Sequence, residues 1–460
     1  MKKIVLPAEE CRILKETDVL VCGGGPAGIA AAISAARKGL DVTLIDEGGC
    51  LGGAIPKGMI SFTESAIESS GDKQLIGGIW WELMDTMEKM GGSIHGHNLI
   101  DHNMYYVFDV SRCEKDLQLP VFEPEIFKAT VEKMVCACGI HVLYHTLAEK
   151  AIVEGNIVTG VVIDNREGRQ VIKAKRVVDA TGLAVIAKSA GAECQNSCKD
   201  ASGQRGSMTV FFRVGGVREV IESYKPNVRE IPYGAVNLFP TVRPGEYRVE
   251  MTRALGNGMN IDDVTKGTMQ CRRQIPEVIG WLKKNWPGCE NAYLIQSGNA
   301  ALTFSFLKII GESTLTQNDM FKANIPEDVI GLCGYGVDIH SAEEGGQNYF
   351  YYFDPGHYYG IGYGSLVPKS KIENILAVGR NISCETGTEA GVISAPVSMV
   401  TGEAAGLACA LSVEQDVFPR NLDIKMLQKE LLEAGVLLEA RPLNRKRKRL
   451  NYYQDTDIGK

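Results

Sequence analysis

The chain has 460 residues, of which 45% are hydrophobic and 23% are charged, and this composition excludes a wholly disordered protein. Its 49 Lys and Arg residues against 56 Asp and Glu residues give a net charge of -7, which argues against a general nucleic-acid binder. No apolar run reaches the roughly 18 residues that cross a bilayer, and the first residues lack the apolar stretch of a secretory signal, so we expect neither a membrane segment nor a leader.

The 13 cysteines are odd in number and irregularly spaced, which does not suit a disulfide framework. We therefore expect a reducing compartment and predict a cytoplasmic protein. Two groups of Cys and His residues lie close in sequence, but neither has an evident shared geometry, so no metal site is predicted. The groups are Cys136, Cys138, His141 and His145, and His95, His97 and His102.

The N-terminal glycine cluster has the pattern of a dinucleotide-binding turn. Val19–Val21 predict a short buried parallel strand, and a helix of small residues is predicted over 29–38. Between them, Gly23, Gly25 and Gly28 form Gly-x-Gly-x-x-Gly. In this pattern the first glycine allows the tight turn, the second lets the backbone approach a pyrophosphate, and the third lets the helix pack close to the strand.

A second strand is predicted over residues 42–45, and Asp46 follows it at a spacing typical of a carboxylate that accepts hydrogen bonds from ribose hydroxyls. Gly52 and Gly53 come soon after, which favours a loop passing close to a cofactor larger than NAD. The strand, turn, helix, strand and acid together indicate dinucleotide binding far more specifically than the glycines alone.

Three further segments carry strand and small-residue signals. Alternating apolar residues over 140–180 predict a small antiparallel meander, which ends at Asp179-Ala180-Thr181-Gly182. A strand is predicted over 375–379, and a helix with small residues is predicted over 397–411.

These motifs resemble the FAD-dependent oxidoreductases of the glutathione-reductase-like superfamily. The similarity rests on Gly23 to Gly28, on Asp179 to Gly182 and on Asn374 to Arg380, and it covers most of residues 15–440. It implies FAD as cofactor and an α/β fold, with a Rossmann-like FAD-binding domain and an inserted α+β cap or substrate domain. The substrate stays open, because the group is chemically diverse.

The resemblance also implies the division of the chain into domains. A discontinuous FAD-binding domain is expected, together with an active-site insertion, a cap and a C-terminal helix with a basic tail. The expected ranges are 1–60, 121–200 and 368–412 for the FAD-binding domain, 61–120 for the insertion, 201–367 for the cap and 413–460 for the C-terminal part.

The predicted FAD contacts combine the turns at the strand ends with the residues that flank them. They are Gly23, Gly25, Pro26, Ala27, Gly28, Asp46, Glu47, Gly52, Gly53, Ala180, Thr181, Gly182, Gly379, Arg380 and Gly391.

Three absences narrow the chemistry. No second strand–GxGxxG–helix unit is present for a built-in NAD(P)H domain, and Cys50 lacks the paired cysteine of a disulfide reductase, since Ile55 stands five residues on. Aromatic hydroxylases of the superfamily have Gly-Asp where this chain has Gly379-Arg380. We therefore predict a dehydrogenase or reductase that transfers a hydride to or from flavin N5. A flavin monooxygenase and an electron-transfer or non-catalytic FAD-binding component are the alternatives.

Several basic positions of the look-alikes are absent here, while Glu385 and Glu389 add acids that are either a base near the flavin or simply solvated. A neutral polyol, sugar-like or phenolic substrate, or a cation, is therefore favoured over a dicarboxylate. The expected partners are this small molecule and an external electron acceptor or NAD(P)H. Nucleic acid and membrane are not expected, and a homo-oligomer is left open, as is the role of the basic tail 441–449.

His340, Asp338 and His357 are the candidate catalytic residues. Asp338 and His340 share strand parity, so they would face one side and could move the proton that accompanies hydride transfer. His357 lies in an aromatic stretch that either lines a pocket or is plain core. Arg213 is weighed between a flavin or substrate contact and a structural role, and Arg380 between a flavin contact and a helix cap.

Overall fold

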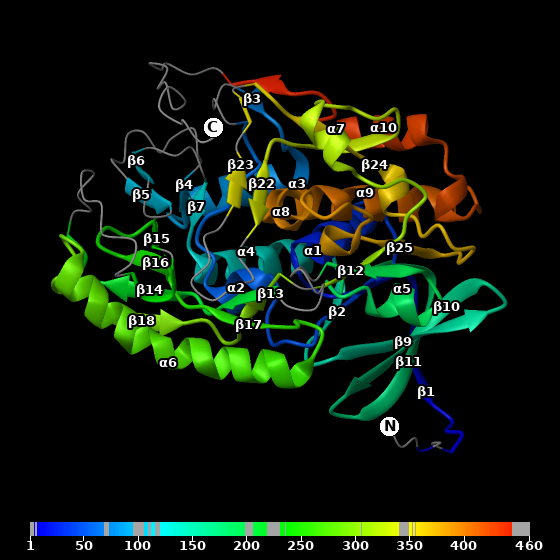
Figure 1. The fold of residues 1–460 in the computed structure, drawn as a ribbon. Helices are drawn as coiled ribbons and strands as arrows, with labels where there is room; N and C mark the ends of the chain where they lie inside the picture. Colours follow the sequence, from blue (N-terminus) through cyan, green and yellow to red (C-terminus); the bar gives the residue numbers. More distant parts are fainter. Residues whose placement is uncertain are drawn as a thin grey trace.

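The computed structural model describes most of the chain (Figure 1). The described residues are 4, 7–68, 73–94, 105–108, 112–115, 120–197, 206–218, 231–234, 236–304, 306–339, 349–351, 353–354 and 356–443. His340 and the tail from residue 444 lie outside them. Every cysteine whose side chain is described is a free thiol.

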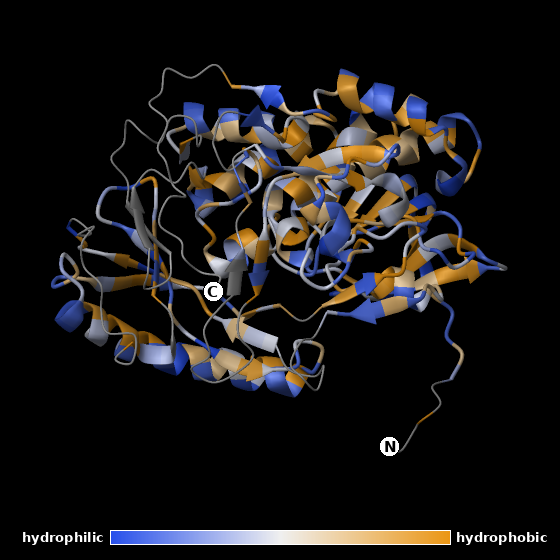
Figure 2. Cartoon of the chain, turned by 45° about the horizontal axis from the view of Figure 1, so that its top comes forward, coloured by the Kyte–Doolittle hydropathy of each residue, from blue (hydrophilic) through white to orange (hydrophobic). Residues whose placement is uncertain are grey.

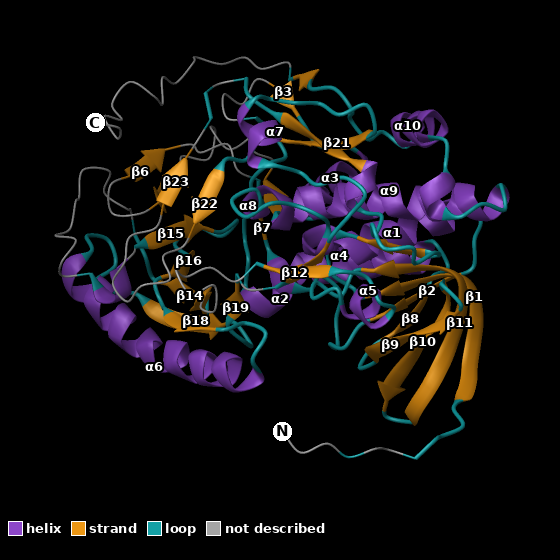
Figure 3. Cartoon of the chain, turned by 45° about the vertical axis from the view of Figure 1, so that its right-hand side comes forward, coloured by secondary structure: helices purple, strands orange, loops and turns teal. Residues whose placement is uncertain are grey.

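A mixed seven-stranded sheet forms the centre of the larger domain, in the order β8-β2-β1-β11-β10-β9, with β25 pairing with β11 beside this path. The pairs β1–β2, β2–β8, β1–β11 and β11–β25 are parallel. Figure 3 shows the sheet fanning out at the right, with α1, α4 and α9 beside it. The strands are β1 (Arg12–Cys22), β2 (Val42–Ile45), β8 (His141–Leu143), β9 (Leu147–Glu154), β10 (Ile157–Asn165), β11 (Gly168–Asp179) and β25 (Ile375–Ala377).

The predicted meander is confirmed, because β9, β10 and β11 pair antiparallel. β1 is much longer than the apolar run Val19–Val21 that predicted it. Its first half pairs with the meander end of β11, where Arg12 lies opposite Gln170 and side chains are partly exposed. Hydrophobicity therefore marked only the half of the strand that lies in the core.

Two helices of small residues cover one face of the sheet and pack unusually closely. They are α1 (Pro26–Arg37) and α9 (Ala395–Glu414). A Cβ added to Gly402 would lie 1.9 Å from the Ala27 carbonyl oxygen, and one added to Gly406 would lie 2.0 Å from Ser34 Oγ. These glycines let the two helix backbones approach each other, as the sequence predicted for this segment.

Among the described residues, α9 is the one helix long and apolar enough to span a bilayer, with a mean hydropathy of 1.3 over its best window. That window is 94% buried inside the protein, where the helix packs against α1, α3 and α10. By length and composition alone this is weak evidence for a span, because a core helix meets the same test.

Glu403 is a buried carboxyl in the middle of α9, and it accepts a hydrogen bond from the Ile79 backbone N–H at 3.0 Å. This contact lies at the start of α3 (Gly78–Lys89). Burial raises the pKa of Glu403 from its ordinary 4.5 to about 8, although the Ile79 N–H and Arg37 oppose the shift.

The raised pKa of Glu403 predicts a pH-dependent stability. Between about pH 4.5 and 8 the folded carboxyl holds a proton that the unfolded chain has lost, so stability falls as pH rises through this window. The slope is at most about 1.4 kcal/mol per pH unit. Glu403→Gln keeps the acceptor for Ile79, so its denaturant stability should lack this slope. Equal pH profiles of the two proteins would contradict the prediction, and Glu414→Gln, at an exposed position at the end of the same helix, serves as the control.

A second, smaller unit is the cap, built on a six-stranded sheet in the order β18-β14-β16-β15-β5-β6. The 25-residue helix α6 (Ile261–Asn285) covers it, and Figure 2 shows hydrophilic and hydrophobic residues alternating along this helix. Its buried residues Cys271, Ile275, Val278 and Leu282 pack in the cap's own hydrophobic cluster. The strands are β5 (Tyr105–Phe108), β6 (Arg112–Lys115), β14 (Phe212–Gly215), β15 (Asn237–Pro240), β16 (Tyr247–Glu250) and β18 (Tyr293–Ser297).

The remaining elements are short or connect the two units. The helices are α2 (Ala54–Gly58), α4 (Pro124–Ala137), α5 (Val185–Ser189), α7 (Gln317–Phe321), α8 (Glu389–Ile393) and α10 (Ile424–Glu433), with 3-10 turns at Pro232–Gly234, Tyr363–Ser365, Gly379–Asn381 and Pro419–Asn421. The strands are β3 (Lys73–Gln74), β4 (Ser93–Ile94), β7 (Val121–Phe122), β12 (Cys194–Asn196), β13 (Gly206–Thr209), β17 (Ala254–Gly256), β19 (Leu302–Thr303), β20 (Leu307–Ile309), β21 (Val329–Cys333), β22 (Val337–Ile339), β23 (Tyr349–Tyr351), β24 (Tyr359–Gly362) and β26 (Arg441–Pro442).

The hydrophobic clusters divide the chain differently from the expected domain ranges. β21 and β24 belong to the cluster around α1 and α9, although residues 201–367 were expected to form the cap. The cap cluster ends at Ala301. The expected insertion 61–120 is also split, since α3 packs on α9 while β5 joins β15 of the cap sheet. Short apolar strands have similar sequences in both units. Tertiary packing therefore decides whether such a strand belongs to the cap or to the larger domain.

Candidate cofactor and substrate site

The carboxyl ends of the parallel strands meet at one edge of the central sheet. Backbone hydrogen bonds tie the segments that follow the strands, from Gly23 N–H to the Ile45 carbonyl at 2.8 Å and from Ala180 N–H to the Cys22 carbonyl at 2.9 Å. Val378 N–H reaches the Asp179 carbonyl at 3.0 Å. This edge is where open α/β sheets bind their ligands.

The glycine turn has the geometry that a pyrophosphate needs. Gly23 has a φ of +109°, and a Cβ there would lie 2.4 Å from the Ala180 carbonyl oxygen. A Cβ on Gly28 would lie 1.8 Å from the Gly23 carbonyl oxygen. Gly25 is the N-cap of α1 and makes no side-chain cap, so the first N–H groups of the helix remain available to an anion.

The second glycine pair, Gly52 and Gly53, lies directly against this turn. Gly52 donates its N–H to the Gly24 carbonyl at 2.8 Å, and a Cβ on Gly53 would lie 2.9 Å from the Gly25 Cα. Both have positive φ values, which glycine adopts without strain. The structure thus brings together two predicted cofactor segments.

Asp46 is buried next to the turn and accepts hydrogen bonds from the Gly24 and Gly48 N–H groups, each at 2.7 Å. Its neighbour Glu47 is exposed and pairs with Lys57 at 3.0 Å. The sequence reasoning missed His145, whose ring would touch a Cβ on Gly49 at 3.0 Å and so lies over the loop that follows Asp46.

Asp179 shapes the third segment, a role that the sequence reasoning missed. Its Oδ1 accepts from the Thr181 hydroxyl at 2.7 Å and its Oδ2 from the Ile186 and Ala187 N–H groups at 2.9 and 2.8 Å. Burial raises its pKa against these hydrogen bonds. The sequence feature that could have indicated this role is a single Asp at the end of an apolar strand.

Arg380 joins the third segment to the fourth. Its Nε donates to the Gly182 carbonyl at 2.6 Å, and its guanidinium lies 5.3 Å from the centre of the Phe306 ring. Burial lowers the pKa of Arg380 to about 10. The sequence also allowed Arg380 to cap a helix. Its hydrogen bond goes instead to the carbonyl of Gly182, which lies before the start of α5.

Lys308 and Glu389 form a buried ion pair near this edge, and Lys308 is completely buried. A solvated position was one of the two alternatives for Glu389, but its side chain is only 10% exposed, because it begins α8 against β20. Glu385 does remain exposed, and it accepts from the Gln317 N–H at 2.9 Å. Glu385 lies before α8 and Glu389 begins it, so the two acids are not on one helix.

Gly391 of α8 lies against the Tyr359 hydroxyl and Cys333 Sγ, which a Cβ would meet at 2.6 and 2.8 Å. The Tyr335 hydroxyl, close by, donates to Asp338 Oδ2 at 3.1 Å. Asp338 thus lies beside the segment that contains Gly391.

His357 makes different contacts. Its Nε2 lies 2.8 Å from the Met320 carbonyl oxygen, and its ring stacks on Phe353 with centroids 4.0 Å apart. These contacts connect His357 to α7 and favour a packing role for its ring.

Burial raises the pKa of the unpaired Cys50 thiol, which disfavours its reactive form. No cluster of three or more metal-ligating side chains occurs in the part of the chain that the structure describes.

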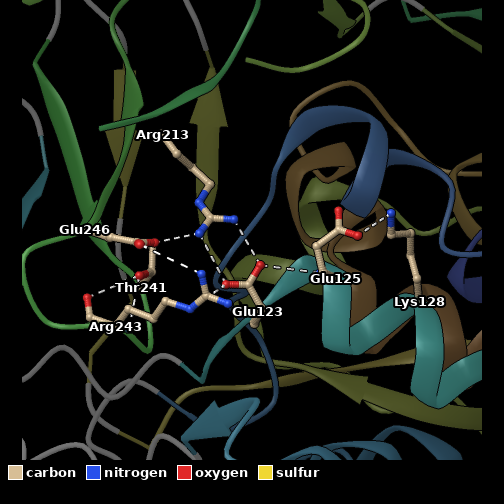
Figure 4. Close-up of polar contacts among 7 residues, drawn as sticks. All are labelled: Glu123, Glu125, Lys128, Arg213, Thr241, Arg243 and Glu246. Atoms are coloured by element: carbon tan, nitrogen blue, oxygen red, sulfur yellow. Dashed lines mark hydrogen bonds and ion pairs between the residues drawn. The ribbon is translucent and has the colours of Figure 1, made fainter. Parts of the chain in front are cut away.

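Arg213 of the cap is held by two acids rather than by an open site (Figure 4). Its guanidinium donates to Glu123 Oε1 at 2.9 Å and to Glu246 Oε2 at 2.6 Å. Glu123 is the N-cap residue of α4, so this buried trio joins the cap to the larger domain.

Arg213→Lys should lower the free energy of unfolding by about 1.5–3 kcal/mol, the value of a hydrogen bond to a charged group. A lysine ammonium cannot reproduce the planar guanidinium, which donates to both carboxylates through separate nitrogens. Lys128→Ala is the control, since Lys128 pairs with Glu125 at the surface at 2.6 Å and such pairs contribute about 0–1 kcal/mol. Urea unfolding measures both. Equal effects of the two changes would disprove the special role of the trio.

A dinucleotide-binding site made of four chain segments, with a cap across from it, is the architecture of a flavoprotein. The turn around Gly25, the free N-terminus of α1 and the buried Asp46 fit FAD. The model of the FAD dependent oxidoreductase family matches residues 18–431, so the chain belongs to this family of flavoenzymes.

The relatives differ in chemistry. The digeranylgeranylglycerophospholipid reductase of Sulfolobus acidocaldarius is 28% identical over 174 residues, which span 36% of this chain and about a third (34%) of the relative. A geranylgeranyl bacteriochlorophyll reductase-like protein of Thermoplasma acidophilum is 17% identical, with 90% and 82% of the two chains covered and a TM-score of 0.46. The flavin-dependent brominase Bmp2 is 14% identical, with 91% and 83% covered and a TM-score of 0.49.

Proposed function

We propose that this oxidoreductase transfers a hydride between flavin N5 and a small organic substrate, with a neutral polyol, sugar-like or phenolic compound favoured. When bound, FAD supplies the two-electron acceptor or donor. The glycine turn and the N-terminus of α1 would hold its pyrophosphate, and Asp46 its ribose. The relative from Sulfolobus acidocaldarius is named a reductase. The proposal therefore includes both directions, oxidation and reduction of the organic substrate.

One observation supports the substrate class. Where the cap meets the larger domain, Glu64 and Glu250 interact with the buried cation Arg248, and Asp338 adds negative charge beside Glu64. Of two further buried cations near this edge, Lys308 is paired with Glu389, and Arg380 donates to the Gly182 carbonyl. A dicarboxylate would meet net negative charge here, whereas a hydroxyl compound would meet hydrogen-bond acceptors.

The proton that accompanies hydride transfer needs a carrier. Asp338, beside Gly391, keeps the candidate role that its sequence position indicated. His340 remains a candidate from the sequence alone. His357 is the weakest of the three, because its ring nitrogen already faces a backbone carbonyl.

The test is anaerobic reduction of the purified holoenzyme by a panel of polyols, sugars and phenols, followed by flavin absorbance. Bleaching by one of these compounds supports the proposal and identifies the substrate class. Bleaching by NAD(P)H alone would replace it with a reductase or monooxygenase, and oxygen uptake stimulated by an organic substrate would select the monooxygenase. A flavin that none of them reduces would favour an electron-transfer role.

A further inference from the structure

His145 lies where the outermost strand of the central sheet ends. β8 pairs only with β2 in the sheet order, so its far edge has no partner strand among the described residues. Asp46 donates its N–H to the Leu143 carbonyl at 3.0 Å, at the end of β8. His145 in turn donates its N–H to the Gly48 carbonyl at 3.0 Å, and Thr146 donates to the Asp46 carbonyl at 2.9 Å. These bonds hold His145 against the loop that carries the ribose acid, at the predicted cofactor edge.

The backbone and the ring of His145 are both held in an unusual way. Its φ is +51°, in the left-handed region that few non-glycine residues adopt, and such conformations are concentrated at functional sites. A Cβ added to Gly49 would lie 3.0 Å from His145 Cε1 and 3.1 Å from its Nε2. Apart from the chain neighbours of Gly49, that Cβ would meet no other atom of the described residues within 4 Å. The imidazole ring therefore packs on a bare glycine, while His145 as a whole remains exposed.

The residues on either side of His145 fix its position. The Tyr144 hydroxyl donates to Glu132 of α4 at 2.5 Å. Thr146 is buried, and its hydroxyl donates to the Tyr144 carbonyl at 3.0 Å. A ring on a segment that is anchored on both sides loses little conformational freedom when a ligand covers it. The ring can therefore contribute most of its contact energy to binding.

The chemistry of a dinucleotide decides what reaches this ring. The N-terminus of α1 is available to the pyrophosphate, and Asp46 is placed to accept from the ribose hydroxyls. The base is bonded to that same ribose, so it must lie beside Asp46, where the segments leaving β2 and β8 meet. In FAD this base is adenine, whose flat purine stacks favourably on aromatic side chains. Leu147, two residues after His145, adds an apolar side chain that is 49% exposed.

We propose that His145 stacks on the adenine of FAD and holds the adenosine end of the cofactor, and that Gly49 is needed to leave room for its ring. The role is one of binding, and it falls on a residue outside the glycine motifs. It concerns how firmly the chain holds its cofactor, so it depends neither on the substrate nor on the direction of hydride transfer.

His145→Asn tests the ring, because asparagine tolerates a positive φ but offers no aromatic surface. Two measurements follow binding without turnover: release of FAD from the holoenzyme on dilution, and calorimetric titration of the flavin-stripped chain with ADP. Both affinities should fall by about 5–150-fold, the effect of removing one aromatic ring from a stacked base. His145→Phe keeps a flat ring and should retain most of the affinity. His141→Ala, at an exposed position where β8 begins, is the control and should change nothing.

Gly49→Ala tests the contact between the ring and the loop. The added methyl group would force the ring outward, and the φ of Gly49 lies outside the left-handed region, so its backbone accepts alanine. ADP affinity should fall in this variant. In the His145→Asn background the same change should have little further effect, since the ring that it would displace is gone. Urea unfolding of the flavin-stripped chain should give nearly the wild-type midpoint for Gly49→Ala and for His145→Asn, which separates lost binding from lost stability.

Wild-type affinity for ADP in His145→Asn would overturn the proposal. A folded His145→Phe protein that binds ADP as weakly as His145→Asn would do the same, because the imidazole would then act through a hydrogen bond rather than through stacking. Failure of every hydroxyl compound to reduce the wild-type flavin would remove the proposed hydride transfer and leave this assignment standing.

Discussion

Gly28→Ala should abolish FAD binding. The added Cβ would lie 1.8 Å from the Gly23 carbonyl oxygen and 3.0 Å from its carbon, both of them backbone atoms that cannot turn away. The turn must open to admit the methyl group, at a cost above the ~1–3 kcal/mol typical of overpacking. Flavin absorbance per protein after purification measures the loss.

Gly25→Ala distinguishes an effect on FAD affinity from an effect on the stability of the fold. The nearest atom to its Cβ is the Gly53 Cα at 4.0 Å, and its φ of -73° suits any residue, so the cofactor-free protein should keep its stability. FAD affinity should still fall, because the methyl group occupies the place where a pyrophosphate would approach. Gly280→Ala, in open space on α6, should gain up to ~1 kcal/mol and keep FAD. Full FAD occupancy in both Gly25→Ala and Gly28→Ala would refute the site.

Lys308→Met should lower the free energy of unfolding by about 3–5 kcal/mol, because it leaves the Glu389 carboxylate buried without its cation. The double variant Lys308→Met with Glu389→Gln should recover most of this loss, since no buried charge remains. Denaturant unfolding of the single and double variants measures the coupling.

The surface pair Lys429–Glu433, at 3.8 Å, provides the control for this experiment. Lys429→Met should change stability by less than about 1 kcal/mol. If the Lys308→Met single variant were as stable as the double variant, Lys308 would not be compensating a buried charge.

The parts of the fold that the sequence predicted correctly have local signals. The strand around Val19–Val21, the turn at Gly23 and the meander each follow from residues close together in the chain. FAD as cofactor followed from the resemblance carried by these motifs, and the family match confirms it. The individual contacts to FAD remain predictions.

The parts that the sequence did not predict depend on partners far apart. Lys308 and Glu389 are 81 residues apart, and no periodic pattern links them. The Arg248 guanidinium lies over the rings of Phe62, Phe211 and Phe239. In the sequence, each of these aromatic residues resembles an ordinary core residue. Burial of a charge is decided by such long-range packing, and so is the boundary of the cap.

The seam between α1 and α9 has a consequence for how the protein is made. The ribosome releases the first glycine turn long before it adds residues 375–414, a delay of roughly 20–80 s at about 5–20 residues per second. During that time the face of α1 that packs on α9 in the finished fold is not covered by that helix. We therefore expect FAD to bind only after the last cofactor segment has been made, and the incomplete chain to expose apolar surface that favours aggregation.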